Sequence, residues 1–168
     1  MEQAFSNLPF PIALIRAGYF YENFLYGLQV GQSGVLPTFC TPTSRRFLMV
    51  ATRDIGAVAA KLLTGPGCSS GSGKRIIELG SMVSPDEVAD QLGRVLAREV
   101  KAQAIPREAW AGAIKEMGLP EGQTWAFEEL FEGLNSGWIN NGVPGTEQVE
   151  GTTLAYDVFT AMQKVIQK

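Results

Sequence analysis

The stretch Pro11-Ile12-Ala13-Leu14-Ile15 runs directly into Arg16-Ala17-Gly18-Tyr19-Phe20-Tyr21-Glu22-Asn23-Phe24. Its first part is short and apolar, a pattern typical of a strand that is buried on both faces of a parallel sheet. In open α/β sheets, ligands bind beyond the carboxyl ends of such strands. The segment that follows the strand is therefore a candidate binding site.

The residues alone leave two interpretations of that segment open. In the first, Ala17 and Gly18 let a flat ring approach the backbone. Tyr19 and Phe20 then pack on the ring, and Asn23 orients one of its polar edges. In the second, the segment is a strand-to-helix turn whose aromatic side chains pack in the core.

The rest of the chain alternates short apolar runs with amphipathic patterns. Extended segments are expected over 34–39, 46–51, 74–79 and 99–105. A short helix or helical turn is expected over 20–28. Helices are expected over 53–64, 84–96, 106–117, 124–134 and 154–166, with a polar, glycine-rich loop over 135–151. Strands that alternate with helices predict an α/β fold.

Two of the expected helices begin with local signals. Ser84-Pro85-Asp86-Glu87 has the pattern of a capping box, with proline at the first helical position. Thr52 is expected to cap the helix over 53–64. Asp54 follows in the first turn of that helix, where the helix dipole favours a negative charge.

The composition excludes several classes of function. The 168 residues suit one domain, and histidine is absent, which rules out catalytic triads and histidine-based metal sites. A net charge of -3 offers no basic excess for a phosphate backbone. The sequence has no signal peptide pattern and no apolar stretch long enough to span a membrane. The two cysteines lie far apart and do not indicate a disulfide framework. We expect a cytoplasmic protein without nucleic-acid or membrane partners.

The glycine-rich stretch from Gly65 to Lys74 does not match a phosphate-binding loop. Cys68 stands where the P-loop pattern needs glycine, and Arg75 where it needs serine or threonine. The stretch also follows an expected helix and precedes a strand, which is the reverse of a phosphate cradle. None of the four tyrosines has a lysine four residues later. The sequence therefore predicts no catalytic residue and no metal site.

The run Arg16-x-Gly18-x-Phe20-x-Glu22-Asn23 after an apolar strand resembles the NmrA-like family of atypical short-chain dehydrogenases. The stretches 47–56, 77–89 and 105–110 resemble the same family in the same order. The resemblance implies a Rossmann-like, NAD(P)-binding fold with a smaller substrate-side lobe. It implies Ala17, Gly18, Tyr19 and Phe20 as cofactor contacts, and Asn23, Tyr26 and Trp110 as substrate contacts.

The resemblance begins at the helix before the sixth strand of such a fold. It therefore implies the C-terminal part alone, one region in which 1–65 end the Rossmann-like sheet and 66–168 form the substrate-side lobe and terminal helices. The N-terminal dinucleotide-binding half is absent from the sequence. We expect a partial NAD(P)-dependent oxidoreductase that is inactive alone and does not bind NAD or NADP by itself.

Other functions and partners remain open at this point. The chain could be a non-catalytic NAD(P) sensor that regulates partners, or a stand-alone interaction module. The resemblance implies that the strands expected beside the apolar strand at 11–15 belong to the missing half. The open apolar edge of such a strand can pair with a strand of another chain. A dinucleotide-binding half or a second copy of this chain is therefore the expected partner.

Overall fold

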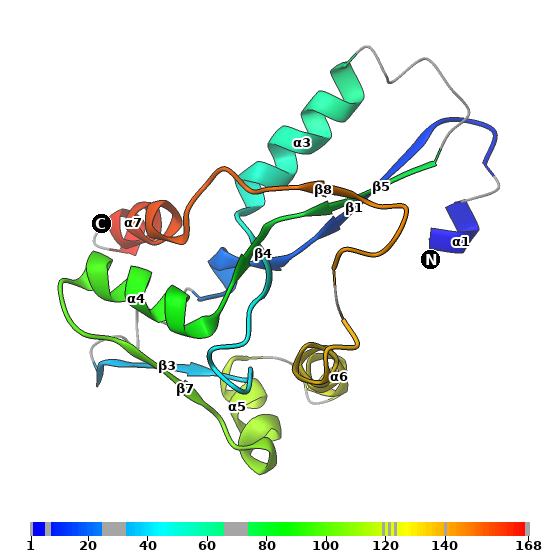
Figure 1. Ribbon diagram of the computed structural model, residues 1–168. Helices are drawn as coiled ribbons and strands as arrows, with labels where there is room; N and C mark the ends of the chain where they lie inside the picture. Colours follow the sequence, from blue (N-terminus) through cyan, green and yellow to red (C-terminus); the bar gives the residue numbers. More distant parts are fainter. Residues whose placement is uncertain are drawn as a thin grey trace.

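The computed structural model describes residues 2–5, 8–24, 33–65, 74–118, 120, 122, 124–139 and 141–166. Within them the predicted α/β alternation is confirmed, as three small sheets with helices around them. In Figure 1 one sheet and the helix α3 (Thr52–Thr64) form the upper part of the molecule. The smallest sheet and three helices form the lower part, which are α4 (Pro85–Leu96), α5 (Trp110–Glu116) and α6 (Thr124–Ser136). The strand β4 (Phe47–Val50) runs between these two parts.

The first sheet is wholly parallel and contains the strand that was predicted from the apolar run. The prediction that this strand is buried on both faces was wrong, because Ile12–Ala17 lies at the edge of the described sheet and none of its residues is fully buried. Its order is β1 (Ile12–Ala17), β5 (Lys74–Leu79) and β8 (Glu147–Val149). The register places Arg16 opposite Glu78. β8 corrects the prediction of a loop over 135–151, because this short polar strand carries no apolar signal and is defined only by its pairing with β5.

Two smaller sheets complete the framework. The strands β2 (Tyr19–Phe20) and β4 (Phe47–Val50) are parallel, and β6 (Ser81–Val83) pairs with β4 in the antiparallel sense. β3 (Val35–Thr38) and β7 (Lys101–Ala104) form a parallel pair. Each of the three sheets combines strands from both sides of residue 65, so the sheets do not divide the chain there.

The segment after β1 agrees in part with the short helix or helical turn predicted over 20–28. Tyr19–Phe20 pairs with the end of β4, and a short 3-10 helix, η1 (Tyr21–Phe24), follows. Tyr21 and Phe24 are buried there. The predicted helical turn is thus present over Tyr21–Phe24, and the prediction was wrong only at Phe20, where the pairing of β2 with a distant strand outweighs the local helical spacing. Residues 25–28 lie outside the described residues.

Seven helical elements belong to the described part of the chain besides η1. They are α1 (Glu2–Phe5), α3 (Thr52–Thr64), α4 (Pro85–Leu96), η3 (Arg107–Ala109), α5 (Trp110–Glu116), α6 (Thr124–Ser136) and α7 (Ala155–Ile166). The helices predicted over 84–96, 124–134 and 154–166 are confirmed to within two residues, and 106–117 divides into η3 and α5. α4 packs beside α7, and α5 packs beside α6.

The two predicted helix starts have different outcomes. The capping box at Ser84 is confirmed: its hydroxyl accepts from the Glu87 N–H at 3.2 Å, and the Glu87 carboxylate accepts from the Ser84 N–H at 2.8 Å. The prediction for Thr52 is wrong. Ala51 is the N-cap of α3, without a side-chain bond. The N–H and hydroxyl of Thr52 donate instead to the Glu22 carboxylate, at 2.9 and 2.6 Å.

The hydrophobic core lies among the sheets and the helices α4, α5, α6 and α7. Its largest fully buried side chains include Leu36, Met49, Leu92, Ile114 and Phe159. These come from elements far apart in the sequence, so the core fixes the arrangement of β3, β4, α4, α5 and α7. Burying each such side chain stabilises the fold by about 1.5–3 kcal/mol before the entropy cost.

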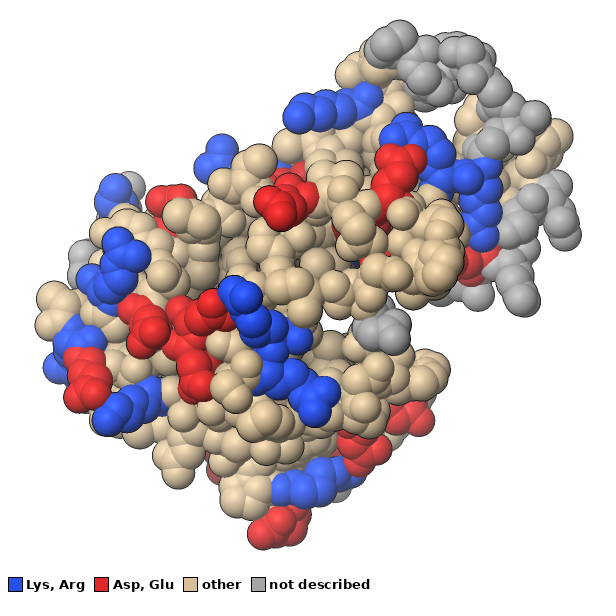
Figure 2. Space-filling view, in the orientation of Figure 1, with Lys and Arg blue, Asp and Glu red and all other residues tan. Residues whose placement is uncertain are grey.

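The surface in view mixes both signs of charge. Figure 2 shows Lys and Arg side chains interspersed with Asp and Glu side chains over this face. Within the described ranges, no helix is long and apolar enough to cross a membrane. The same ranges hold no group of three His, Cys, Asp or Glu residues that could bind a metal ion.

Candidate functional site

A cavity of about 410 Å³ lies beyond the carboxyl end of β1, between β4 and α6. This volume is in the range of small-molecule sites. Five of the seven predicted site residues line it, which are Ala17, Gly18, Tyr19, Phe20 and Asn23. The structure thus brings residues 17–20 and Asn23 to one cavity, where a parallel α/β arrangement is expected to bind ligands.

The other two predicted residues have different positions. Tyr26 lies outside the described residues. Trp110 is only 3% exposed, its indole N–H donates to the Ile105 carbonyl at 2.9 Å, and its ring packs edge-on against Phe39 and Phe131. Trp110 is therefore a core residue that does not line the cavity.

The cavity has nine further lining residues that the sequence did not single out. They are Arg16, Phe47, Leu48, Glu78, Phe127, Leu130, Leu134, Ile139 and Asn141. The apolar face of α6 was expected from its helical spacing, but such spacing does not distinguish a core from a cavity wall. Arg16 and Glu78 occupy matching register positions of two strands, and only the pairing of these strands brings the two residues together.

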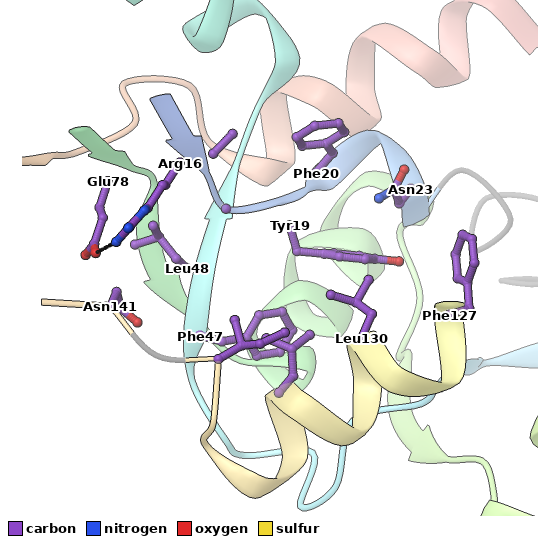
Figure 3. Close-up of a pocket in the computed structure, with 14 residues that line it drawn as sticks. Arg16, Tyr19, Phe20, Asn23, Phe47, Leu48, Glu78, Phe127, Leu130 and Asn141 are labelled. Carbon is purple, nitrogen blue, oxygen red and sulfur yellow. Dashed lines mark ion pairs between the residues drawn. The ribbon is translucent and has the colours of Figure 1, made fainter. Parts of the chain in front are cut away.

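The cavity has a polar end and an aromatic end. In Figure 3, Arg16, Glu78 and Asn141 lie at one side, and Tyr19, Asn23 and Phe127 lie at the other. Leu130 reaches from α6 toward the Tyr19 ring. This arrangement suits a flat, mostly apolar molecule that carries a polar group at one end.

Tyr19 forms the centre of the aromatic end. Its ring contacts Phe24 and Phe47 edge-on, with centroids 5.5 and 6.2 Å apart. Burial raises the pKa of the Tyr19 hydroxyl, and a side-chain hydrogen bond with Asn23 opposes this only in part. The phenol therefore stays protonated at neutral pH, where it can donate a hydrogen bond but cannot act as a base.

Gly18 lies between β1 and β2, close to the backbone of β4. A Cβ built on it would lie 2.5 Å from both the carbonyl carbon and the carbonyl oxygen of Leu48. Its own N–H donates to the Leu79 carbonyl at 2.9 Å. The backbone of β4 leaves no room for a side chain at this position, so the fold itself requires glycine here. The contact of Gly18 with a ligand ring stays a prediction.

The polar end is built on a buried carboxylate. Glu78 is only 3% exposed, and its Oε2 accepts from the Gly142 N–H at 2.6 Å and from Gln148 Nε2 at 2.7 Å. Its Oε1 lies 3.5 Å from Arg16 Nη1 and has no hydrogen-bond partner. Figure 3 marks this ion pair with a dashed line.

The surroundings of Glu78 keep it ionised. Burial alone would raise the pKa of its carboxyl. The hydrogen bonds from Gln148, Gly142 and Val143, together with the charge of Arg16, outweigh burial and leave the pKa below the usual 4.5. The carboxylate is thus a fixed negative charge behind Arg16.

Solved structures of several reductases have a similar fold. An NADPH-dependent quinone oxidoreductase from Escherichia coli is 21% identical, with a TM-score of 0.67 over 90% of this chain and 55% of that one. The triphenylmethane reductase of a Citrobacter species is also 21% identical, with a TM-score of 0.69 over 94% of this chain and 54% of that one. Both proteins were also solved with NADPH or NADP(H) bound.

These likenesses concern the fold, and the present chain spans about half the length of the solved structures that it matches. No curated protein matches the sequence. A model of the family described as "NmrA-like family" matches residues 1–161. Since the match covers nearly all of the sequence, the chain belongs to the NmrA-like family.

Proposed function

We propose that this chain forms the ring-binding part of an NAD(P)-dependent oxidoreductase, in which a nicotinamide ring and a flat substrate meet in the cavity beside Tyr19. The observation that carries the proposal is the cavity itself. It lies at the carboxyl end of β1, it is lined mainly by apolar side chains, and it contains Ala17, Gly18, Tyr19, Phe20 and Asn23. Family membership supports the same reading.

The chemistry of the cavity fits a reaction carried by a cofactor. When bound, the dinucleotide would supply the hydride. The residues of this chain would hold and orient the rings: Phe47 and Leu130 as apolar walls, and Tyr19 and Asn23 as hydrogen-bonding groups. The ionisable side chains among the described lining residues are Arg16, Tyr19 and Glu78, and none has the pKa of a general base at neutral pH.

The phosphates of the dinucleotide would be held elsewhere. In the described part of the chain, no glycine-rich turn leads from a strand into a helix, which is the arrangement that cradles a pyrophosphate. Our proposal therefore includes a separate dinucleotide-binding half, a chain that is inactive alone, and a cytoplasmic location. The single sulfhydryl described, Cys40, is free, as is usual in that compartment.

A ring-only analogue of the reduced cofactor tests this proposal, because its binding needs no phosphate site. N-benzyl-dihydronicotinamide should bind the chain with a millimolar dissociation constant in saturation-transfer NMR. NADPH should show no micromolar binding and no turnover with a panel of quinones and cationic dyes. Leu130→Trp should fill the cavity and abolish binding of the analogue. An unchanged affinity in Leu130→Trp, with the fold intact, would overturn the proposal.

The outer edge of β1 favours a partner strand. β1 ends the sheet order β1-β5-β8, so no strand of the described chain pairs with that edge. Phe5 and Phe10, which precede β1, are 43% and 56% exposed. We infer that the dinucleotide-binding half, or a second copy of this chain, covers this edge. Light scattering should detect a dimer or larger species, and a monomer at high concentration would contradict the inference.

A further inference from the structure

The polar end of the cavity contains Arg16, whose positive charge is already balanced by neighbouring carboxylates. Arg16 and Glu78 are the charged residues of the described cavity lining. Arg16 also contacts Glu2 through two bonds, Nε to Oε1 at 2.8 Å and Nη2 to Oε2 at 2.9 Å. One guanidinium is thus held between two carboxylates.

In this arrangement Arg16 can still donate hydrogen bonds, although its positive charge is balanced by the neighbouring carboxylates. A guanidinium has five N–H donors, and the two hydrogen bonds with Glu2 use two of them. Nη1 lies 3.5 Å from Glu78 Oε1, an ion pair without a hydrogen bond. At least two N–H groups therefore remain that can donate to a ligand in the cavity. Because Arg16 is held from both sides, donation to a ligand costs little side-chain entropy.

The nearby cations do not add a net positive charge. Lys74, the first residue of β5, helps to lower the pKa of the Glu2 carboxyl, although the hydrogen bonds from Arg16 are the main cause of that shift. The positive charges of Arg16 and Lys74 are thus matched by the negative charges of Glu2 and Glu78. Arg75 pairs with Glu147 at 2.8 Å. A ligand in the cavity thus meets donors but no net positive charge.

We propose that Arg16, held by Glu78 and Glu2, is a specificity residue that binds the carbonyl oxygen of an uncharged flat ring, while the two carboxylates exclude a ring that carries a carboxylate in the same place. The proposal rests on the proposed function, since it concerns the same cavity. A carbonyl of this kind can belong to the carboxamide of a nicotinamide ring or to a quinone-like substrate.

Nicotinamide and nicotinate form the test pair, because they share a ring and differ by one charge at neutral pH. Saturation-transfer NMR on the full chain should show at least a tenfold preference for nicotinamide. Glu2→Gln should narrow that preference by about two- to fivefold, which is the range for a partly exposed charge. Glu78→Gln should narrow it by about tenfold, because the buried charge is less screened.

Glu147→Gln is the matched control for these variants. Glu147 lies on β8 and pairs with Arg75 of β5 in the same sheet, but neither residue lines the cavity. The nicotinamide preference of Glu147→Gln should equal that of the unmodified chain. A preference that changes in Glu147→Gln as much as in Glu2→Gln would show a general effect of net charge and would overturn the role of Arg16.

Arg16→Lys and Arg16→Met distinguish the two sources of the carbonyl. Menadione serves as the quinone-like probe beside nicotinamide. The probe whose affinity falls about tenfold in Arg16→Met, with partial recovery in Arg16→Lys, identifies the ring that Arg16 binds. If neither affinity falls, the inference is wrong while the proposed function stands. If no ring binds the unmodified chain at all, both are wrong.

Discussion

Gly18 approaches Leu48 so closely that a Cβ on Gly18 would lie 2.5 Å from the carbonyl carbon and oxygen of Leu48. These are backbone atoms of the paired strand β4, which cannot move aside without breaking the β2-β4-β6 sheet. Gly18→Ala should therefore lower the free energy of unfolding by about 3 kcal/mol or more. Urea unfolding followed by circular dichroism measures the change.

Gly56→Ala is the control for this substitution. Gly56 lies within α3, and a Cβ there would have no atom within 4 Å. Alanine at a helix interior should raise stability by about 0.5–1 kcal/mol. Equal stabilities of Gly18→Ala and the unmodified chain would contradict the close approach of β2 and β4.

Asp54→Asn should destabilise the protein by about 2–3 kcal/mol. Asp54 is buried in the first turn of α3 and accepts four hydrogen bonds, from the N–H and hydroxyl groups of Thr152 and Thr153, at 2.7–3.1 Å. An amide would lose the charge and present an N–H₂ group to these donors. The melting temperature should fall by about 5–10 °C, while the exposed Asp90→Asn should leave it unchanged.

Acid should unfold the protein partly through Glu78 and Asp54. Burial would raise both pKa values, but hydrogen bonds from Gln148 to Glu78 and from Thr153 to Asp54 help to bring them below the usual 4.5 and 3.8. Because both pKa values are lower in the folded state, this stability is present above pH 4.5 and is lost as the pH falls through the folded-state values. Glu78→Gln should flatten the slope of stability against pH below 4.5. If the slope equals that of the unmodified chain, Glu78 does not contribute to acid unfolding.

Asn23→Ala should weaken ring binding and leave stability almost unchanged. Asn23 is exposed at the cavity and bonds to the Tyr19 hydroxyl. Loss of one hydrogen bond should reduce the affinity for N-benzyl-dihydronicotinamide by about three- to tenfold.

Asn135→Ala should show the opposite pattern to Asn23→Ala. The Asn135 side chain accepts from the Thr41 N–H and donates to the Phe39 carbonyl, both at 2.9 Å. It does not line the cavity. Its loss should lower the melting temperature by about 4–8 °C, with affinity per folded molecule unchanged. Two variants that behave alike would contradict a binding role for Asn23.

Cys40 should resist alkylation while the protein is folded. The side chain is 1% exposed, and burial raises the pKa of its thiol to about 11. At pH 8 a smaller fraction of Cys40 is therefore thiolate, and Cys40 should be alkylated about 100-fold more slowly than in the unfolded chain. Iodoacetamide labelling, followed by mass spectrometry of the peptide that contains Cys40, measures both rates. Fast labelling without urea would indicate that the core opens locally.

The sequence by itself determined the alternation of strands and helices, the capped start of α4 at Ser84, and the position of the segment 17–23 after an apolar strand. These features follow from local patterns: apolar runs, helical spacing and capping residues within a few positions of one another. The absence of histidine likewise excluded whole classes of catalysis without any structure.

The tertiary structure decided everything that depends on contacts between distant residues. It paired Arg16 with Glu78, it set Gly18 against Leu48, and it placed Trp110 in the core rather than at the cavity. It also made a strand of Glu147–Val149, whose polar residues carry no strand signal. The physical reason is the same in each case: pairing register and side-chain packing join segments tens of residues apart, and local patterns do not encode these contacts.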